Sequence, residues 1–218
     1  MNKIEITADG SATIYVPQLD EHYHSVKGAL TESLHIFRDC AFLHHPEVNR
    51  PLRVLEIGFG TGLNAVVTAM AANESHQAHY ISLELFPVEM EMVEKLNYGE
   101  MVDSNLLMAL HQAQWESPQP ITQFFTLEKR KCDFTQCVLP NEIDIVYFDA
   151  FAPEKQPEMW SEELFARIYA SMSDGGILTT YCAKGEIRRR LQRVGFIVER
   201  LQGPPGGKRE ILRATKAN

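Results

Sequence analysis

The stretch Val54-Leu55-Glu56-Ile57-Gly58-Phe59-Gly60-Thr61-Gly62-Leu63 decides the fold. Its first four residues form a short apolar run typical of a buried strand, and small residues at 64–72 favour a helix after it. The three glycines let backbone amides approach a ligand where a Cβ would collide. A dinucleotide-binding turn would need a glycine at position 63, which is Leu63. The spacing therefore excludes a dinucleotide turn, and a glycine turn that serves only packing is the alternative.

Strands and helices alternate after this stretch. The expected strands are 53–57, 79–85, 124–132, 143–148 and 177–182, and the expected helices are 64–72, 88–95, 162–172 and 186–194. Two more strands, 196–201 and 210–214, are joined by a Gly/Pro-rich loop without a helix, so they should pair antiparallel. This order predicts an α/β fold with a mostly parallel seven-stranded sheet that ends in an antiparallel hairpin.

The first 50 residues precede this alternation. Two β-prone runs, 4–6 and 13–16, flank the turn-forming pair Asp9-Gly10, and apolar residues recur at helical spacing from 29 to 43. We expect residues 1–50 to form a β-hairpin and helix extension, and residues 51–218 to form the main domain.

The composition is that of an ordinary globular protein, with 44% hydrophobic and 23% charged residues in a chain of 218. The four cysteines are too scattered for a disulfide framework, and neither they nor the eight histidines have metal-ligand spacing. No apolar run approaches the ~20 residues that cross a bilayer, and the N-terminus lacks a secretion signal. We expect a cytoplasmic protein without a metal, a membrane segment or an evident protein partner.

The spacing Gly-x-Gly-x-Gly, with Glu56 two residues before the first glycine, resembles motif I of the Rossmann-like S-adenosylmethionine-dependent methyltransferases. The resemblance implies that the cofactor is held by Glu56, Gly58, Phe59, Gly60, Thr61, Gly62 and Asn64. Glu84 ends the second strand at the carboxyl edge of the sheet, where a carboxylate can accept both ribose hydroxyls. Asp133 follows the third strand and would lie near the adenine amino group, with a purely structural role as the alternative.

Asp149 ends the fourth strand, at the position where amino-methylating enzymes present a polar group to the nucleophile. Methyl transfer needs an unprotonated amine held in line with the departing sulfur, and an alkyl amine is largely protonated at neutral pH. Three roles stay open for Asp149: orienting the ammonium, accepting its proton, or holding the amino group of the cofactor. In each of them Asp149 is the candidate catalytic residue.

The run from Asp149 to Trp160, Asp-Ala-Phe-Ala-Pro-Glu-Lys-Gln-Pro-Glu-Met-Trp, closely resembles the signature of the MnmC-type tRNA (5-methylaminomethyl-2-thiouridine) methyltransferases. Further similarity lies at 23–25, 29–33, 58–64 and 206–210, while Ala150 and Gln156 depart from the glycine and asparagine of the signature. The resemblance implies methylation of the aminomethyl group of 5-aminomethyl-2-thiouridine at the tRNA wobble position. The family's bifunctional members carry an added flavin-dependent oxidase domain, and this sequence resembles the stand-alone form.

Positive charge is concentrated near the end of the sequence. Residues 184–218 hold ten Lys and Arg against three Asp and Glu, although the net charge of the chain is −8. We expect Lys184, Arg188, Arg189, Lys208 and Arg209 to contact tRNA phosphates. Trp160, Phe151 and Tyr181 could stack a splayed base, and Ala152 and Pro153 would complete a rigid substrate wall. A solvated basic helix and a packing role for Trp160 are the alternatives.

Three other functions fit parts of the pattern. A spermidine synthase-like aminopropyltransferase shares the fold, motif I and an acid after the fourth strand, but it would need further acids to bind a diamine. A methyltransferase for another small amine is the second possibility. The third is a cofactor-binding regulator or RNA scaffold with a degenerate site, against which the intact Glu56, glycines, Glu84 and Asp149 argue.

Overall fold

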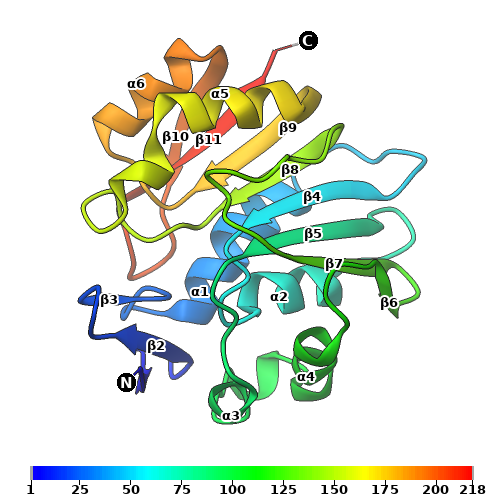
Figure 1. Cartoon of the computed structure of the whole chain (residues 1–218), viewed down its shortest axis with the longest axis vertical. Helices are drawn as coiled ribbons and strands as arrows, with labels where there is room; N and C mark the ends of the chain where they lie inside the picture. The colour runs from blue at the N-terminus through cyan, green and yellow to red at the C-terminus, as the bar shows by residue number, and fades with distance from the viewer. Residues whose placement is uncertain (1, 218) are drawn as a thin grey trace.

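A computed structural model describes residues 2–217, and an eight-stranded sheet runs through its centre (Figure 1). The strands are β4 (Leu52–Ile57), β5 (Ala78–Glu84), β6 (Gln119–Thr122), β7 (Phe125–Lys131), β8 (Ile143–Phe148), β9 (Met172–Thr180), β10 (Phe196–Gln202) and β11 (Glu210–Lys216). Their order in the sheet is β10-β11-β9-β8-β4-β5-β7-β6. The five central strands pair in parallel, whereas β6, β10 and β11 pair antiparallel. The expected α/β fold and the closing antiparallel hairpin are confirmed.

Helices cover both faces of the sheet. They are α1 (Ala29–Ser33), η1 (Leu34–Phe42), α2 (Leu63–Ala71), α3 (Met90–Val93), η2 (Gly99–Met101), α4 (Ser104–Gln112), η3 (Pro157–Trp160), α5 (Glu162–Ser171) and α6 (Gly185–Arg193). Side chains alternate along each strand, so Val54 of β4 joins a core with η1, α2 and α4. Its neighbour Leu55 joins a second core with α5 and α6. The sheet is therefore buried between two helical layers, which accounts for its nearly continuous apolar strands.

The predicted count of seven strands is wrong by one, because β6 adds an antiparallel strand beside β7. Its sequence is Gln119-Pro120-Ile121-Thr122, and proline is tolerated there because β6 lies at the edge of the sheet. Because it is short and contains a proline, this segment lacks the alternation of β-branched residues that predicts a strand. Helix α4, whose N-cap Asp103 accepts hydrogen bonds from the amides of Asn105 and Leu106, was also not predicted.

The start of β9 also differs from the expectation. It begins at Met172, and Gly175 and Gly176 lie inside the strand rather than before it. The pairing with β8 shifts register between Ile143 and Ile145, so the strand is irregular where the glycines lie. Glycine inside a strand commonly marks such an irregularity. The helix expected at 88–95 is shorter than predicted, since α3 is confined to Met90–Val93.

The N-terminal segment folds as the sequence predicts. Strands β1 (Lys3–Ile6) and β2 (Ala12–Val16) form an antiparallel hairpin, and a short β3 (Glu21–His22) extends it to three strands. A continuous helical run follows over 29–42, with π-type turns in η1, which packs against α2, β8, β9 and β11. The boundary at residue 50 stays a prediction. None of the helices in residues 2–217 is long and apolar enough to cross a membrane.

Candidate active site

The glycine loop joins β4 to α2 at the carboxyl edge of the sheet. Gly58, Gly60 and Gly62 have φ values of 92°, 51° and 73°, in the left-handed region that side-chain-bearing residues rarely adopt. Gly62 is also the N-cap of α2. A Cβ on Gly60 would lie 2.8 Å from the Tyr23 ring, and a Cβ on Gly62 would lie 2.8 Å from His111 Nε2. The loop therefore needs glycine for its backbone and for the close packing around it.

Two acids stand beside the loop on neighbouring strands. Glu84, the last residue of β5, accepts hydrogen bonds from the Gly60 amide at 2.9 Å and from the Phe86 amide at 2.8 Å. Asp133 follows β7, and its carboxylate accepts from the amide and the hydroxyl of Thr135. Because the carboxyl ends of parallel strands meet at one edge, three segments far apart in sequence converge here.

A cavity of about 140 Å³ lies between these segments. Of the ten residues expected to hold the cofactor, eight line it: Gly58, Phe59, Gly60, Thr61, Asn64, Glu84, Asp133 and Asp149. Apolar side chains of Leu85, Phe86, Phe134 and Met159 form the rest of its wall. The donor chemistry fits S-adenosylmethionine, since Glu84 can accept from a ribose, the loop amides can face the methionine part, and the apolar wall suits an adenine.

Glu56 and Gly62 do not line this cavity. Glu56 is fully buried beneath the loop, where one carboxylate oxygen accepts from Ser82 Oγ at 2.6 Å. Its other oxygen, Oε1, has no hydrogen-bond partner among the described residues. Burial raises the pKa of Glu56 to about 8, so the carboxyl is largely protonated at neutral pH. The structure corrects the sequence assignment, because Glu56 is a buried support of the loop rather than part of the cavity wall.

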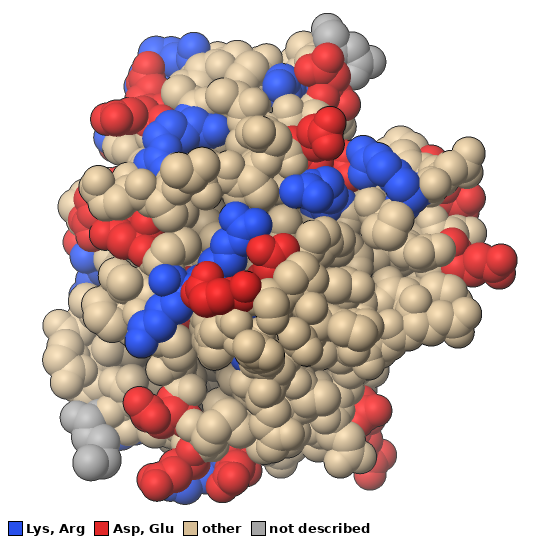
Figure 2. Space-filling view, turned by 45° about the vertical axis from the view of Figure 1, so that its right-hand side comes forward, with Lys and Arg blue, Asp and Glu red and all other residues tan. Residues whose placement is uncertain are grey.

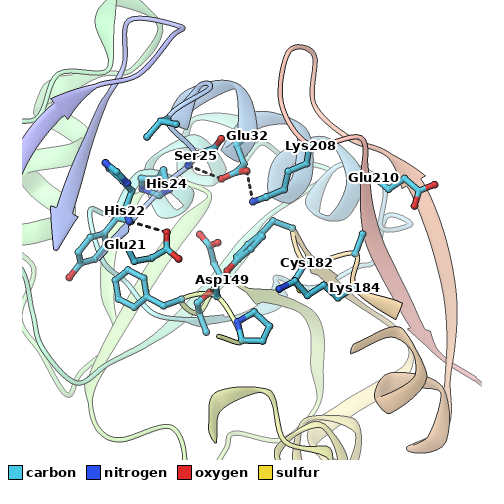
Figure 3. Close-up of a pocket in the computed structure, with 18 of the residues that line it drawn as sticks. Glu21, His22, His24, Ser25, Glu32, Asp149, Cys182, Lys184, Lys208 and Glu210 are labelled. Atoms are coloured by element: carbon cyan, nitrogen blue, oxygen red, sulfur yellow. Dashed lines mark hydrogen bonds and ion pairs between the residues drawn. The ribbon is translucent and has the colours of Figure 1, made fainter. Parts of the chain in front are cut away.

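Asp149 follows β8 and lies where two cavities meet. It lines the cofactor cavity and also a larger open cavity of about 640 Å³ (Figure 3). Asn64 Nδ2 donates to Asp149 Oδ2 at 2.8 Å and fixes the carboxylate. Burial raises the pKa of Asp149 to about 8, and the nearby Glu32 carboxylate adds to the rise against the opposing effects of Asn64 and Lys208. A carboxyl with this pKa can exchange a proton near neutral pH.

The open cavity brings together most of the predicted substrate residues. Its wall includes Phe151, Ala152, Pro153, Tyr181, Lys184, Lys208 and Arg209. Tyr181 is anchored by its hydroxyl, which donates to the Ala150 carbonyl at 2.9 Å. The cavity also carries four carboxylates, those of Glu21, Glu32, Asp149 and Glu210. It can therefore accept a group with both aromatic and cationic character.

Trp160 does not belong to this wall, which corrects its prediction as a stacking residue. It is fully buried and packs edge-on against Phe148, at a ring distance of 4.8 Å. Its indole nitrogen donates to the Phe151 carbonyl at 2.8 Å. Trp160 therefore supports the Phe151 segment from behind, and it cannot stack on a nucleobase.

The basic C-terminal region is more divided than its sequence suggests. Arg188 and Arg189 of α6 line neither of the two cavities described above. Most of the other cations pair with acids, among them Lys184 with Glu154 and Arg193 with Glu162. Figure 2 shows Lys and Arg interspersed with Asp and Glu on the face in view. The exposed Arg189 and the rim residue Arg209 have no ion pair within the described chain.

Seven residues of the open cavity come from the N-terminal segment and were not predicted individually: Glu21, His22, Tyr23, His24, Ser25, Val26 and Glu32. Tyr23 and His24 line both cavities, and Glu32 lines the open one. The Tyr23 ring lies edge-on to Phe151 at 5.2 Å, and His24 Nε2 shares a hydrogen bond of 2.7 Å with Thr61 Oγ1. Burial lowers the pKa of His24 to about 4, so its imidazole is neutral. The only signal for Tyr23, His24 and Glu32 was the family similarity at 23–25 and 29–33.

A buried pair supports the glycine loop from the α4 side. His111 Nε2 donates to the Thr61 carbonyl at 2.9 Å, and Lys129 Nζ donates to the His111 carbonyl at 2.6 Å. Lys129 is only 1% exposed and lies over the rings of Trp115 and Phe59, 4.7 and 5.3 Å from their centroids. Burial lowers the pKa of Lys129 to about 8. These contacts fix the loop backbone without reaching the cavities.

Known proteins resemble the chain in sequence. Residues 122–217 match the model of a family described as S-adenosyl-L-methionine-dependent methyltransferase. The tRNA 5-methylaminomethyl-2-thiouridine biosynthesis bifunctional protein MnmC of Cupriavidus necator is 32% identical over 92% of this chain and 32% of its own length. The protein of the same name from Actinobacillus pleuropneumoniae is 30% identical over 89% of this chain and 32% of its own. The chain thus spans about a third of these relatives.

Solved structures resemble it as well. MNMC2 from Aquifex aeolicus aligns with a TM-score of 0.80 and 25% identity, over 100% of this chain and 72% of the other. Spermidine synthase from Thermotoga maritima aligns with a TM-score of 0.60 and 17% identity over 99% of this chain and 72% of its own, which shows a shared fold alone. In sequence and fold, the chain therefore resembles S-adenosyl-L-methionine-dependent methyltransferases, and its similarity to the MnmC proteins extends over about nine tenths of its length.

Proposed function

We propose that this chain transfers the methyl group of S-adenosylmethionine to the aminomethyl nitrogen of 5-aminomethyl-2-thiouridine at the tRNA wobble position. The observation that carries the proposal is the place of Asp149, whose side chain lines both cavities. A nucleophile in the open cavity and a methyl donor in the smaller one would meet at this carboxylate. The names of the MnmC relatives support this choice of nucleophile. A tRNA substrate would also place the enzyme in the cytoplasm.

The residues around Asp149 suit this reaction. When bound, the cofactor would supply an electrophilic methyl group, whose bond to the positively charged sulfur breaks as the N–C bond forms and leaves a neutral thioether. Asp149, held by Asn64, is placed to orient the substrate ammonium and take one of its protons, which frees the nitrogen lone pair for the new N–C bond. Glu84, the glycine loop and Asp133 are proposed to hold the cofactor. Phe151 is proposed to receive the splayed base, with Tyr181, Ala152 and Pro153 forming the wall around the substrate.

The cations of this region are proposed to bind the tRNA backbone. Lys184, Lys208 and Arg209 lie on the wall of the open cavity, where they could reach phosphates next to the wobble nucleotide. Arg188 and Arg189 on α6 lie away from the cavity wall, so they would contact phosphates more distant from the reacting base. Charge contacts of this kind give affinity that depends on salt rather than on sequence.

A second candidate is supported by the acids of the open cavity. Glu21, Glu32 and Glu210 join Asp149 there, and a diamine would need several carboxylates. An aminopropyltransferase would therefore also find suitable groups in this cavity. Its donor would be decarboxylated S-adenosylmethionine rather than S-adenosylmethionine itself.

One assay separates the two candidates. Purified protein is given labelled S-adenosylmethionine with tRNA that carries 5-aminomethyl-2-thiouridine, and tRNA without the aminomethyl group serves as the control. We expect label only in the aminomethylated tRNA, as the methylaminomethyl nucleoside after digestion. Putrescine with decarboxylated S-adenosylmethionine forms the second arm. No transfer to the modified tRNA, together with aminopropyl transfer to putrescine, would overturn the proposal.

A further inference from the structure

Lys208 and Glu32 meet across the open cavity, although 176 positions separate them in sequence (Figure 3). Lys208 Nζ lies 3.3 Å from Glu32 Oε2 and 3.7 Å from the centroid of the Tyr181 ring. Glu32 is 5% exposed, and its other carboxylate oxygen accepts from the Ser25 amide at 3.2 Å. The lysine ammonium thus rests on an aromatic face beside a buried carboxylate.

This surrounding is what a primary alkylammonium group requires. A carboxylate supplies charge and hydrogen-bond acceptors, and an aromatic face adds a cation–π contact. A buried carboxylate without a counter-ion is costly, so Glu32 needs a cation beside it at all times. The place is also beside the reacting group, because Glu32, Lys208 and Asp149 line the same cavity.

The present occupant of this place, Lys208, is partly open to solvent. The Lys208 side chain is 40% exposed, and it stands on the loop between β10 and β11, which contains Gly203, Pro204, Pro205, Gly206 and Gly207. Glu32, in contrast, is buried in helix α1 and accepts a hydrogen bond from the Ser25 amide, so its position does not depend on Lys208 alone. A partly exposed cation beside a buried anion suits an exchange of one ammonium for another.

We infer that Glu32 and the Tyr181 ring form the seat of the substrate's aminomethyl cation, and that Lys208 occupies this seat until the substrate arrives. The inference rests on the proposed function, whose substrate carries the same primary ammonium group as lysine. The exchange leaves the charge of the buried site unchanged and keeps Glu32 paired at every stage. Glu32 is thereby a positioning residue, and Asp149 on the cofactor side receives the proton.

The alternative is that the Lys208–Glu32 pair only ties the two segments together. The two views predict different effects of two substitutions on recognition of the aminomethyl group. If the pair is only a tie, Glu32→Gln and Lys208→Met break the same contact and change recognition equally or not at all. If the lysine holds a place for the substrate, Glu32→Gln removes the seat, whereas Lys208→Met removes the competitor for it.

The measured quantity is the ratio of the dissociation constants of two tRNAs, one with 2-thiouridine and one with 5-aminomethyl-2-thiouridine at the wobble position. Phosphate contacts cancel in this ratio, so a backbone role of Lys208 does not enter it. Binding is measured with the protein loaded with S-adenosylhomocysteine, which prevents turnover. The control is Lys216→Met, since Lys216 also pairs with an acid, Asp174, and lies over a tyrosine ring, that of Tyr169.

We expect Glu32→Gln to reduce the preference for the aminomethylated tRNA about tenfold, the effect of losing one charged hydrogen bond. Lys208→Met should raise the preference, and Lys216→Met should leave it unchanged. Equal effects of the first two variants, or an unchanged ratio in Glu32→Gln, would overturn the inference. Failure of the proposed function has a different signature, because the wild-type protein itself would then neither prefer nor methylate the aminomethylated tRNA.

Discussion

Asp149 concentrates the chemistry of the site in one side chain. Its carboxylate has a fixed partner in Asn64, lies at the boundary of the two cavities, and has a pKa raised to about 8. Only the ionised carboxylate can take a proton from an ammonium group, so the ionisation of Asp149 should appear in the pH dependence of turnover.

We predict that kcat/KM of the wild-type enzyme rises with pH through about 8, as Asp149 ionises. Asp149→Asn should lower turnover roughly 10²- to 10⁴-fold, the usual contribution of a general base, and should remove this inflection. The profile is measured with saturating cofactor, and circular dichroism checks that the variant is folded. Turnover near the wild-type rate would mean that Asp149 is only structural.

Trp160 shows how a residue of the signature can have a different role from the one predicted for it. Its place at the end of the Asp149–Trp160 signature suggested contact with the substrate, yet the side chain is fully buried. Its neighbour Phe151 does reach both cavities. Exposure is decided by how η3 packs against β8 and α5, and no local pattern in the sequence contains that information.

At the scale of elements, the strand–loop–helix unit around the glycines was predictable because its signals are local. The apolar run of β4, the glycines and the small residues of α2 stand next to each other in the chain. Strand β6 was not predicted because Pro120 is untypical of a strand. Tyr23, His24 and Glu32 were not predicted because long-range packing brings them to the site. Family similarity, rather than periodicity, was the only guide to these three residues.

The tight fit of the glycine loop gives a direct prediction. Gly60→Ala should weaken cofactor binding at least tenfold, since the residue has φ of 51° and its Cβ would lie 2.8 Å from the Tyr23 ring. Strain of this kind costs about 1–3 kcal/mol. Gly99→Ala is the matched control, with φ of 71° and no neighbour within 4 Å of its Cβ. Calorimetric titration with S-adenosylmethionine should show a loss of affinity for Gly60→Ala alone. Equal affinities of the two variants would contradict the prediction that the loop has no room for a Cβ at position 60.

Helix α6 allows a test of the basic surface. Arg189→Glu should weaken tRNA binding and lower the slope of log K against log salt by about one, while cofactor affinity is unchanged. Lys95→Glu serves as the control, because Lys95 is exposed near α3, and α3 and α6 lie at opposite ends of the molecule (Figure 1). If Arg189→Glu and Lys95→Glu bind tRNA equally well across a salt titration, α6 does not contact the phosphate backbone of the tRNA.

At the scale of the molecule, buried titratable groups link the site to stability. Burial raises the pKa values of Asp149 and Glu56 to about 8 and lowers those of His24 and His111 to about 4. Between pH 4 and 6.5 the two pairs have opposite effects, because the folded chain binds extra protons at the acids and fewer at the histidines. Above pH 6.5 the two acids dominate, and the folded state then loses protons that stabilise it, whereas the opposing effect of Lys129, with a pKa lowered to about 8, develops only near and above pH 8.

We therefore predict that the cofactor-free protein loses stability as pH rises from about 6.5 to about 8. Glu56→Gln should lessen this loss, since the amide cannot ionise, and should raise Tm at pH 8 by a few degrees. Ser82→Ala serves as the comparison, because it removes the hydrogen bond to Glu56 but leaves an ionisable carboxyl. The loss of stability with rising pH should therefore persist in this variant. Melting curves across this pH range test the prediction, which fails if Tm of the wild-type protein is constant or rises.

The position of β11 has a consequence for synthesis on the ribosome. It is the last strand of the described chain, yet it pairs along one side with β10 and along the other with β9. A nascent chain therefore completes its glycine loop well before residues 210–216 emerge, and during that interval β9 has an open edge and β10 has no partner. Exposed strand edges invite pairing with other chains. The emerging chain should consequently depend most on protection by chaperones just before β11 inserts.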